Sequence, residues 1–270
     1  MKRLIPHTEP PQADASSLVD RELLEAQVRD MYRRVAREEE AELHFALGRL
    51  LALRLGYPSE LLDAIPEESL ASFAGVGYHL DLAALAAGER VLDLGSGSGT
   101  DVFCAAVQTG GRGAAVGVDF TDEQVAKARR LRDRDGFGQA DFVEASIDAL
   151  PFDTACFDAV ISNGVINLSP VKHRVFAEAA RVLRPGGRLA LADIVSARPL
   201  KERTRRNVEL WAACIAGAIP RDSYLNALEA AGFCVQQVRR NDYDFISDRA
   251  VVACSTYGVE SISIAAVKDA

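Results

Sequence analysis

Apolar residues recur every three or four positions over residues 18–55, among charged residues and without an internal proline. This period predicts amphipathic helices. A polar break over 37–40 divides the segment into two helices, and Gly56 ends the second. A short helix is expected after Pro66, and a loop over 75–78 follows it.

From residue 89 onward, short apolar runs alternate with amphipathic segments. Such alternation predicts a parallel sheet with helices on both faces. No helix is predicted between the last two strands, because 245–258 is expected to be loop, so these strands should pair antiparallel. The fold class is therefore α/β, with a doubly wound, mostly parallel, seven-stranded sheet of Rossmann-like type. The expected strands are 90–94, 114–119, 140–144, 157–162, 188–193, 235–243 and 261–267, and the expected helices are 101–108, 122–133, 172–183, 197–218 and 223–231.

These patterns divide the chain into three parts. Residues 1–17 are polar and predict a disordered lead-in. Residues 18–84 predict a helical lid. Residues 85–270 predict the α/β domain, in which 197–222 form an insertion after the fifth strand that contributes to the substrate site.

The charge of the chain argues against several classes of partner. The 270 residues include 31 Lys and Arg against 39 Asp and Glu, a formal net charge of −8. Proteins that bind nucleic acid usually carry a basic stripe that neutralises phosphates, so no nucleic-acid partner is expected. No run approaches the roughly 18 apolar residues that span a bilayer, and the polar N-terminus is not typical of a signal peptide. We therefore expect no membrane association either.

The five cysteines are scattered and form no Cys-x-x-Cys pair. This usage is typical of reduced thiols in the cytoplasm, and it predicts neither a disulfide framework nor a metal site. Nothing in the sequence indicates the oligomeric state.

A glycine-rich loop follows the first predicted strand. Its glycines let the chain turn and approach a ligand, and the helix that starts at once directs free N–H groups at that ligand. An acid precedes the first glycine, where it would repel a pyrophosphate but can hold an ammonium group. The Gly-x-Gly-x-Gly spacing also differs from the dinucleotide fingerprint. Both details favour S-adenosylmethionine as the cofactor. The loop residues are Asp93, Gly95, Ser96, Gly97, Gly99 and Thr100.

A second acid supports this interpretation. Asp119 ends the next strand, roughly 20 residues beyond the loop, where an acid can accept the ribose hydroxyls. Phe120 offers a flat apolar wall to the adenine. Separately, Asp93 could cap a helix and Asp119 could stand in a turn. Together with the glycines, the two acids favour the cofactor site.

Motifs beyond the loop resemble the class I methyltransferases. They are Gly-Val-Asp-Phe-Thr at 117–121, Leu-Pro-Phe at 150–152 and Arg-Pro-Gly-Gly at 184–187, and with the loop they span about residues 85–195. Segments 161–170 and 211–218 resemble the arsenite methyltransferases in particular. With Tyr32, they extend the likeness to nearly the whole chain.

The resemblance implies further cofactor-site residues. Tyr32 should lie at the cofactor, Ser146 and Ile147 should line the adenine, and Asn163 should lie near the methionine end. Ser146 departs from the acid that usually contacts the adenine amino group. A hydroxyl can still accept that hydrogen bond, more weakly.

The substrate site departs further from the family. Arsenite methyltransferases hold arsenic(III) with three thiolates, and one of these matches Cys214. Gly164 and Val76 stand where the other two are expected. A thiophilic ion needs several sulfur ligands. The resemblance therefore predicts the family's frame without its arsenic site, and an acceptor bulkier than an inorganic ion. The expected substrate residues are Gly164, Asn167, Trp211 and Cys214, although Trp211 and Cys214 could simply pack their helix.

Candidates for a catalytic base are few. His79 follows the 75–78 loop and Tyr78 ends it, so both are candidates at the methyl group. For each, a buried structural role is the alternative.

Three hypotheses follow. The leading one is a methyltransferase that acts on a small organic acceptor, such as a metabolite or natural-product intermediate. The second is an arsenical or thiol S-methyltransferase that uses Cys214. The third, of another class, is a non-catalytic regulatory protein that binds S-adenosylmethionine.

Overall fold

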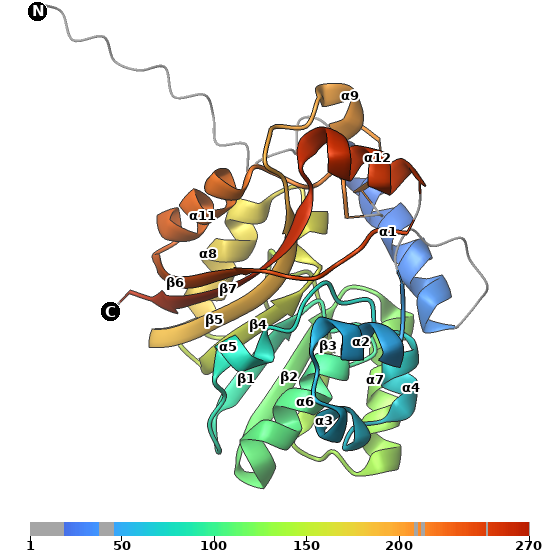
Figure 1. Ribbon diagram of the computed structural model, residues 1–270. Helices are drawn as coiled ribbons and strands as arrows, with labels where there is room; N and C mark the ends of the chain where they lie inside the picture. The colour runs from blue at the N-terminus through green and yellow to red at the C-terminus, as the bar shows by residue number, and fades with distance from the viewer. Residues whose placement is uncertain (1–18, 38–45, 208–209, 212–213, 247, 270) are drawn as a thin grey trace, which may run out of the picture.

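The computed structural model describes residues 19–37, 46–207, 210–211, 214–246 and 248–269. It contains one seven-stranded sheet in the order β3-β2-β1-β4-β5-β7-β6 (Figure 1). The first five strands run parallel, and β7 pairs antiparallel with both β5 and β6. The strands are β1 Arg90–Leu94, β2 Ala114–Asp119, β3 Ala140–Glu144, β4 Phe157–Asn163, β5 Leu183–Val195, β6 Phe233–Arg240 and β7 Glu260–Lys268.

Helices cover both faces of this sheet. The α-helices are α1 Arg21–Ala36, α2 Arg49–Leu55, α3 Ser59–Asp63, α4 Glu67–Ala71, α5 Leu80–Ala83, α6 Thr100–Thr109, α7 Asp122–Asp135, α8 Lys172–Val182, α9 Glu202–Arg205, α11 Arg221–Ala230 and α12 Asp248–Tyr257. Two 3₁₀ turns are η1 Gly110–Arg112 and η2 Ile166–Leu168.

Successive residues of a strand point to opposite faces of the sheet, so they pack into two different hydrophobic cores. In β1, Val91 packs with α6, α7 and the helices α2 to α4, whereas Leu92 packs with α8 and α11. Because both faces are buried, the parallel strands consist of nearly continuous apolar runs. This is why the sequence predicted the sheet well.

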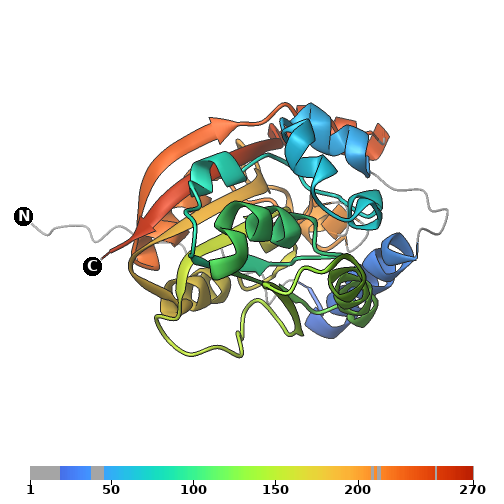
Figure 2. The same ribbon diagram turned by 90° about the horizontal axis from the view of Figure 1, so that it is seen from below.

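A third core joins the N-terminal helix to the C-terminal half of the chain. Val28 of α1 packs with Ile194 of β5, Trp211 of the insertion and Ala253 of α12. On its other side α1 lies beside α7, where Arg33 pairs with Asp122 at 3.2 Å (Figure 2). Helix α1 is therefore fixed to two separate parts of the α/β body. Among the described residues, no helix is long and apolar enough to cross a membrane.

The predicted fold class is confirmed, but the loop predicted over 245–258 is wrong. Helix α12 occupies most of it, although β6 and β7 still pair antiparallel as predicted. Its helical pattern is weak because Val251 and Val252 face solvent, whereas Ala253 packs inward. With apolar residues on the outer side, the periodicity gives no clear signal.

The helix predicted over 197–218 is also wrong as a continuous element. Helix α9 covers only four residues and ends before Asn207, whose side chain accepts from the N–H of Leu210. Such a side-chain bond starts a new turn in place of continuing a helix. Cys214 then takes a φ of 60°, outside helical geometry. In the N-terminal part, α2 begins only at Arg49, and the break predicted over 37–40 falls mostly outside the described residues.

Candidate functional site

Two adjoining cavities open at the carboxyl ends of β1, β2 and β4. Their volumes are about 290 Å³ and about 70 Å³, and both are lined by Gly95, Asp119, Phe120, Val165 and Leu168. The chain leaves β1 toward β2 on one side, and β4 lies on the other. Such a reversal of strand order is where open α/β sheets bind ligands.

The glycine loop forms the wall between the sheet and the smaller cavity. Gly95 has a φ of 74°, and a Cβ there would lie 2.4 Å from Val165 Cγ2. Gly97 has a φ of 52°, and its N–H donates to Asp119 Oδ2 at 2.9 Å. The ten-residue helix α6 begins immediately afterwards. The chain turns here as only glycine allows, and it presents the N-terminal N–H groups of α6.

Three carboxylates, those of Asp93, Asp101 and Asp119, line the smaller cavity, and no Lys or Arg stands among its described lining residues. Burial raises the pKa of Asp93 well above its usual range, and the nearby charges of Asp101 and Asp119 raise it further. Burial also raises the pKa of Asp119. A cation in this cavity would lower these raised pKa values, whereas a phosphate would raise them further. The charge therefore fits a cationic ligand.

Asp119 also orders the loop around it. Its Oδ1 accepts from the N–H of Thr121 at 2.8 Å, while its Oδ2 accepts from Gly97. Next to it, Phe120 lines both cavities, with the Arg29 guanidinium 5.1 Å above its ring. Ser96 also lines the smaller cavity, and its buried hydroxyl has no hydrogen-bond partner among the described residues. That hydroxyl and the acids leave polar groups available to a ligand.

Asn163, at the end of β4, connects the cavity to the 75–78 loop. Its Oδ1 accepts from the N–H of Val76 at 2.8 Å, and its Nδ2 donates to the carbonyl of Gly77 at 3.0 Å. The same Nδ2 contacts the Tyr57 hydroxyl at 3.0 Å and Asp101 Oδ2 at 3.2 Å. The amide therefore holds this loop against the cavity wall.

Tyr57 and Asp101 are two residues of this site that were not predicted from the sequence. The hydroxyl of Tyr57 donates to Asp101 Oδ1 at 2.5 Å. The position of Asp101, an acid in the first turn of the helix after the glycine loop, could have marked it as a site residue. Tyr57 had no such signal, because only the folded chain brings it to that helix.

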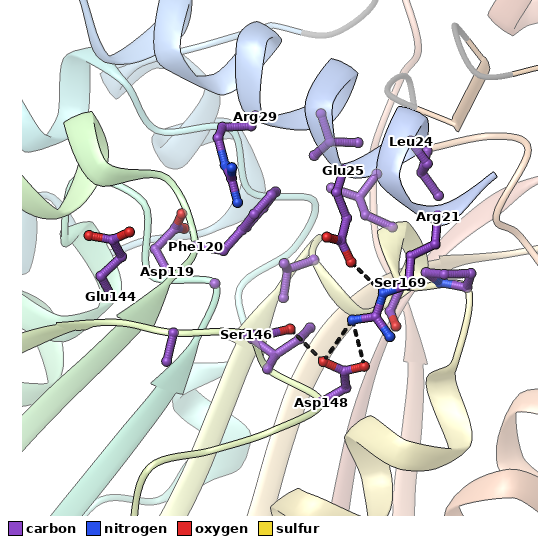
Figure 3. Close-up of a pocket in the computed structure, with 17 residues that line it drawn as sticks. Arg21, Leu24, Glu25, Arg29, Asp119, Phe120, Glu144, Ser146, Asp148 and Ser169 are labelled. Atoms are coloured by element: carbon purple, nitrogen blue, oxygen red, sulfur yellow. Dashed lines mark hydrogen bonds and ion pairs between the residues drawn. The ribbon is translucent and has the colours of Figure 1, made fainter. Parts of the chain in front are cut away.

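The larger cavity contains the predicted adenine residues Ser146 and Ile147, and an unpredicted acid (Figure 3). Asp148 accepts a hydrogen bond from Ser146 and pairs with Arg21 of α1 at 3.0 Å. Its signal was its position two residues after Ser146. Arg21 could not be found in this way, since α1 is distant in sequence.

The three positions compared with arsenic-binding cysteines lie together beside the smaller cavity. Gly164 lines it, and a Cβ on Gly164 would lie 3.3 Å from Val76 Cγ1. The thiol of Cys214 donates to the Gly164 carbonyl at 3.7 Å and is hydrogen-bonded to Tyr32. Tyr32 itself lines this cavity. One sulfur therefore faces two positions that have none.

Five predicted site residues do not line either cavity: Cys214, described above, and His79, Tyr78, Trp211 and Asn167. His79 is buried at the start of α5, and burial lowers its pKa. Tyr78 packs its ring on Tyr57, with 4.7 Å between ring centroids. Trp211 is buried and donates to the carbonyl of Arg205. Asn167 is buried and its Nδ2 donates to the carbonyl of Cys214, so it supports the Cys214 turn. Thr100 does line the smaller cavity, but its hydroxyl donates to the carbonyl of Ser69.

Comparison with known proteins identifies the family. Residues 85–232, more than half of the chain, match the model of a methyltransferase domain. The chain belongs to the class I S-adenosylmethionine-dependent methyltransferases. S-adenosylmethionine is the cofactor of this family, and the acidic, glycine-lined cavity fits its cationic end. The predicted resemblance and cofactor are therefore confirmed.

Two curated relatives show which methyltransferases this chain resembles. An arsenite methyltransferase of Halobacterium salinarum is 38% identical over 197 residues, which cover 72% of this chain and 50% of that protein. A ubiquinone/menaquinone biosynthesis C-methyltransferase of Serratia proteamaculans is 35% identical over 118 residues, 43% of this chain and 47% of that protein. The chain spans about half the length of the curated relatives it matches.

A solved structure gives the same family as the arsenite methyltransferase relative. An arsenic(III) S-adenosylmethionine methyltransferase from Chlamydomonas reinhardtii superposes with a TM-score of 0.62 at 30% identity, covering 83% of this chain and 75% of that one. The chain is thus close to the arsenite methyltransferase family in sequence and in fold.

Proposed function

We propose that this methyltransferase transfers the methyl group of S-adenosylmethionine to a small organic acceptor. When bound, the cofactor supplies an electrophilic methyl group on a sulfonium. The chain's own residues must hold it, bring the acceptor to it and exclude water. Family membership supports methyl transfer. The residues Val76, Gly164 and Cys214, which we call the acceptor side of the site, support an organic acceptor.

We assign the cofactor to the two adjoining cavities. Asp93 and the N–H groups of the glycine loop would hold the amino-acid end, Asp119 the ribose, and Phe120 the adenine. Val165 and Leu168 belong to the lining that joins the two cavities. The full proposed set is Tyr32, Asp93, Gly95, Ser96, Gly97, Thr100, Asp119, Phe120, Ser146, Ile147 and Asn163.

One observation carries the choice of acceptor: Val76, Gly164 and Cys214 lie together, and only one of them has a sulfur. Arsenic(III) is thiophilic and needs several thiolates. Burial raises the pKa of the Cys214 thiol to about 12, so even this sulfur is held as a neutral thiol.

The nature of the cavity walls supports an acceptor that needs little help from a base. Neither cavity has a histidine or lysine among its described lining residues, and His79 and Tyr78 line neither. Of the acids in the smaller cavity, Asp93 and Asp119 are assigned to the cofactor, and Asp101 is engaged by Tyr57 and Asn163. An acceptor whose attacking atom is already a good nucleophile fits such a site.

The test is methyl transfer to arsenite by the purified protein, with glutathione present. We expect turnover at least about a hundredfold below that of a relative with three cysteines, because two thiolates are missing. Turnover comparable to that relative would contradict the proposal. Transfer of labelled methyl groups into the small-molecule fraction of a cell extract, absent with Gly164→Trp, would support it.

A second candidate is methylation of a thiol-bound or already methylated arsenical. The position of Cys214 beside Gly164 and the names of the relatives favour it. This reading requires Cys214, so methylarsenite should be methylated by the native protein and not by Cys214→Ser. Equal rates in the two proteins would exclude it.

A further inference from the structure

Ser146 stands where the family resemblance leads one to expect an acid, and the structure supplies an acid behind it. Both Ser146 and Asp148 line the larger cavity. The Asp148 side chain is almost fully buried, and the Ser146 hydroxyl donates its proton to Asp148 Oδ1 (Figure 3). This contact fixes which way the hydroxyl points.

The direction of that hydrogen bond determines what Ser146 can offer to a ligand. A serine hydroxyl has one proton and two lone pairs, whereas an ionised carboxylate has only acceptors. Once the proton is given to Asp148, the hydroxyl can only accept from the cavity. The carboxylate also polarises the Ser146 hydroxyl, because a hydrogen bond to a charged acceptor is stronger than one between two neutral groups.

Asp148 is itself held in place from the opposite side. Arg21 of α1 lies 3.0 Å from its Oδ2 and 3.3 Å from its Oδ1. The same guanidinium pairs with Glu25 at 2.5 Å. Both carboxylate oxygens of Asp148 are therefore engaged by Arg21 or Ser146. The Ser146 oxygen keeps a lone pair that can accept from a ligand in the cavity it lines.

We propose that Asp148 is a positioning residue that makes the Ser146 hydroxyl an obligate acceptor for the exocyclic amino group of adenine. The pair selects a base that carries an amino group there over one that carries a carbonyl. This rests on the proposed placement of the adenine in the larger cavity. It assigns to two residues the role that one acid would otherwise perform.

The test compares S-adenosylhomocysteine with S-inosylhomocysteine, in which a carbonyl replaces the amino group. Calorimetry on the full chain gives the ratio of the two dissociation constants. We expect the native protein to prefer the adenine form at least about tenfold, because the carbonyl would face an acceptor with no proton between them. In Asp148→Asn the amide can donate to Ser146, whose hydroxyl is then free to donate to the carbonyl. The preference should fall to within about threefold.

Asp153→Asn is the matched control, since Asp153 is an exposed acid on the same connection after β3 and lines neither cavity. It should keep the native ratio. Ser146→Ala, a small truncation, should lose the preference, and it decides the matter if Asp148→Asn does not fold. A native ratio near one, or an unchanged ratio in Asp148→Asn or Ser146→Ala, would overturn the proposal. Failure of the native protein to bind either ligand would instead contradict the cofactor assignment.

Discussion

Gly164 lies directly against the side chain of Val76, although the first residue follows β4 and the second belongs to the loop before α5. A Cβ built on Gly164 would be 3.3 Å from Val76 Cγ1, and Gly164 has a φ of 74°. Cys214 completes the group through the Gly164 carbonyl. The fold thus assembles the three positions at which the resemblance expects sulfur, with only one sulfur present.

Restoring the missing sulfurs should create an arsenic site. In the Val76→Cys, Gly164→Cys double variant we expect arsenite to raise the melting temperature by several degrees, because binding to the folded state stabilises it. Without arsenite the variant should melt below the native protein, since a non-glycine residue at this φ costs about 1–3 kcal/mol. Thermal unfolding with and without arsenite measures both effects. Adding Cys214→Ser should remove most of the arsenite shift, and an equal shift in the native protein would contradict the prediction.

Asp119 should be required for cofactor binding. Asp119→Asn replaces one carboxylate oxygen by an NH₂ group, which cannot accept from Gly97, Thr121 or a ribose hydroxyl. A hydrogen bond to a charged group contributes about 1.5–3 kcal/mol, so the dissociation constant of S-adenosylhomocysteine should rise about 10- to 100-fold. Calorimetry measures it, and the exposed Asp153→Asn serves as the control. A change of less than about threefold would show that Asp119 does not hold the ligand.

Asn163 should couple the 75–78 loop to the cavity. Asn163→Ala removes its bonds to Val76, Gly77, Tyr57 and Asp101. Buried partners left unsatisfied cost about 1–3 kcal/mol, so the melting temperature should fall by roughly 3–10 °C and cofactor affinity should fall with it. Calorimetric melting checks this. Asn226→Ala, at an exposed position of α11, should leave both quantities unchanged, and an unaltered melting temperature in Asn163→Ala would contradict the prediction.

Lys172 should make stability depend on pH above neutrality. Burial lowers its pKa to about 7 from 10.5, and the buried amine donates to the carbonyls of Asn167 and Ser169. Between these pKa values the unfolded chain binds a proton that the folded chain does not. The contribution of Lys172 to stability therefore rises with pH in this window, by about 1.4 kcal/mol per pH unit.

The variant Lys172→Met lacks this slope. Relative to the native protein, it should lose roughly 2 kcal/mol of unfolding free energy from about pH 7.5 to about pH 9. Loss of the amine also makes Asp193 harder to ionise, because their charges attract, and this acts in the same direction. Urea unfolding at the two pH values gives the difference. The exposed Lys201→Met should show no such trend, and parallel pH profiles of Lys172→Met and the native protein would rule out the assignment.

Local patterns were enough to predict the sheet, its mostly parallel order and the cofactor. The strands are buried on both faces, so their apolar runs are continuous and easily recognised. The glycine loop and Asp93 are contiguous, and Asp119 follows at a fixed distance, because strand–turn–helix geometry determines that spacing. Helix α12 and the broken insertion were predicted wrongly, since Val251 and Val252 face solvent and Asn207 restarts the helix through its side chain.

The tertiary structure alone decided which distant side chains meet. Tyr57 meets Asp101 and Asn163, Arg21 meets Asp148, and Val76 lies with Gly164 and Cys214. His79, by contrast, is adjacent in sequence to a cavity loop and yet points into the core. The sequence thus determined the methyl donor, because a short contiguous segment forms its site. The meeting of Val76, Gly164 and Cys214 follows from the packing of three separate segments, which no local sequence pattern records.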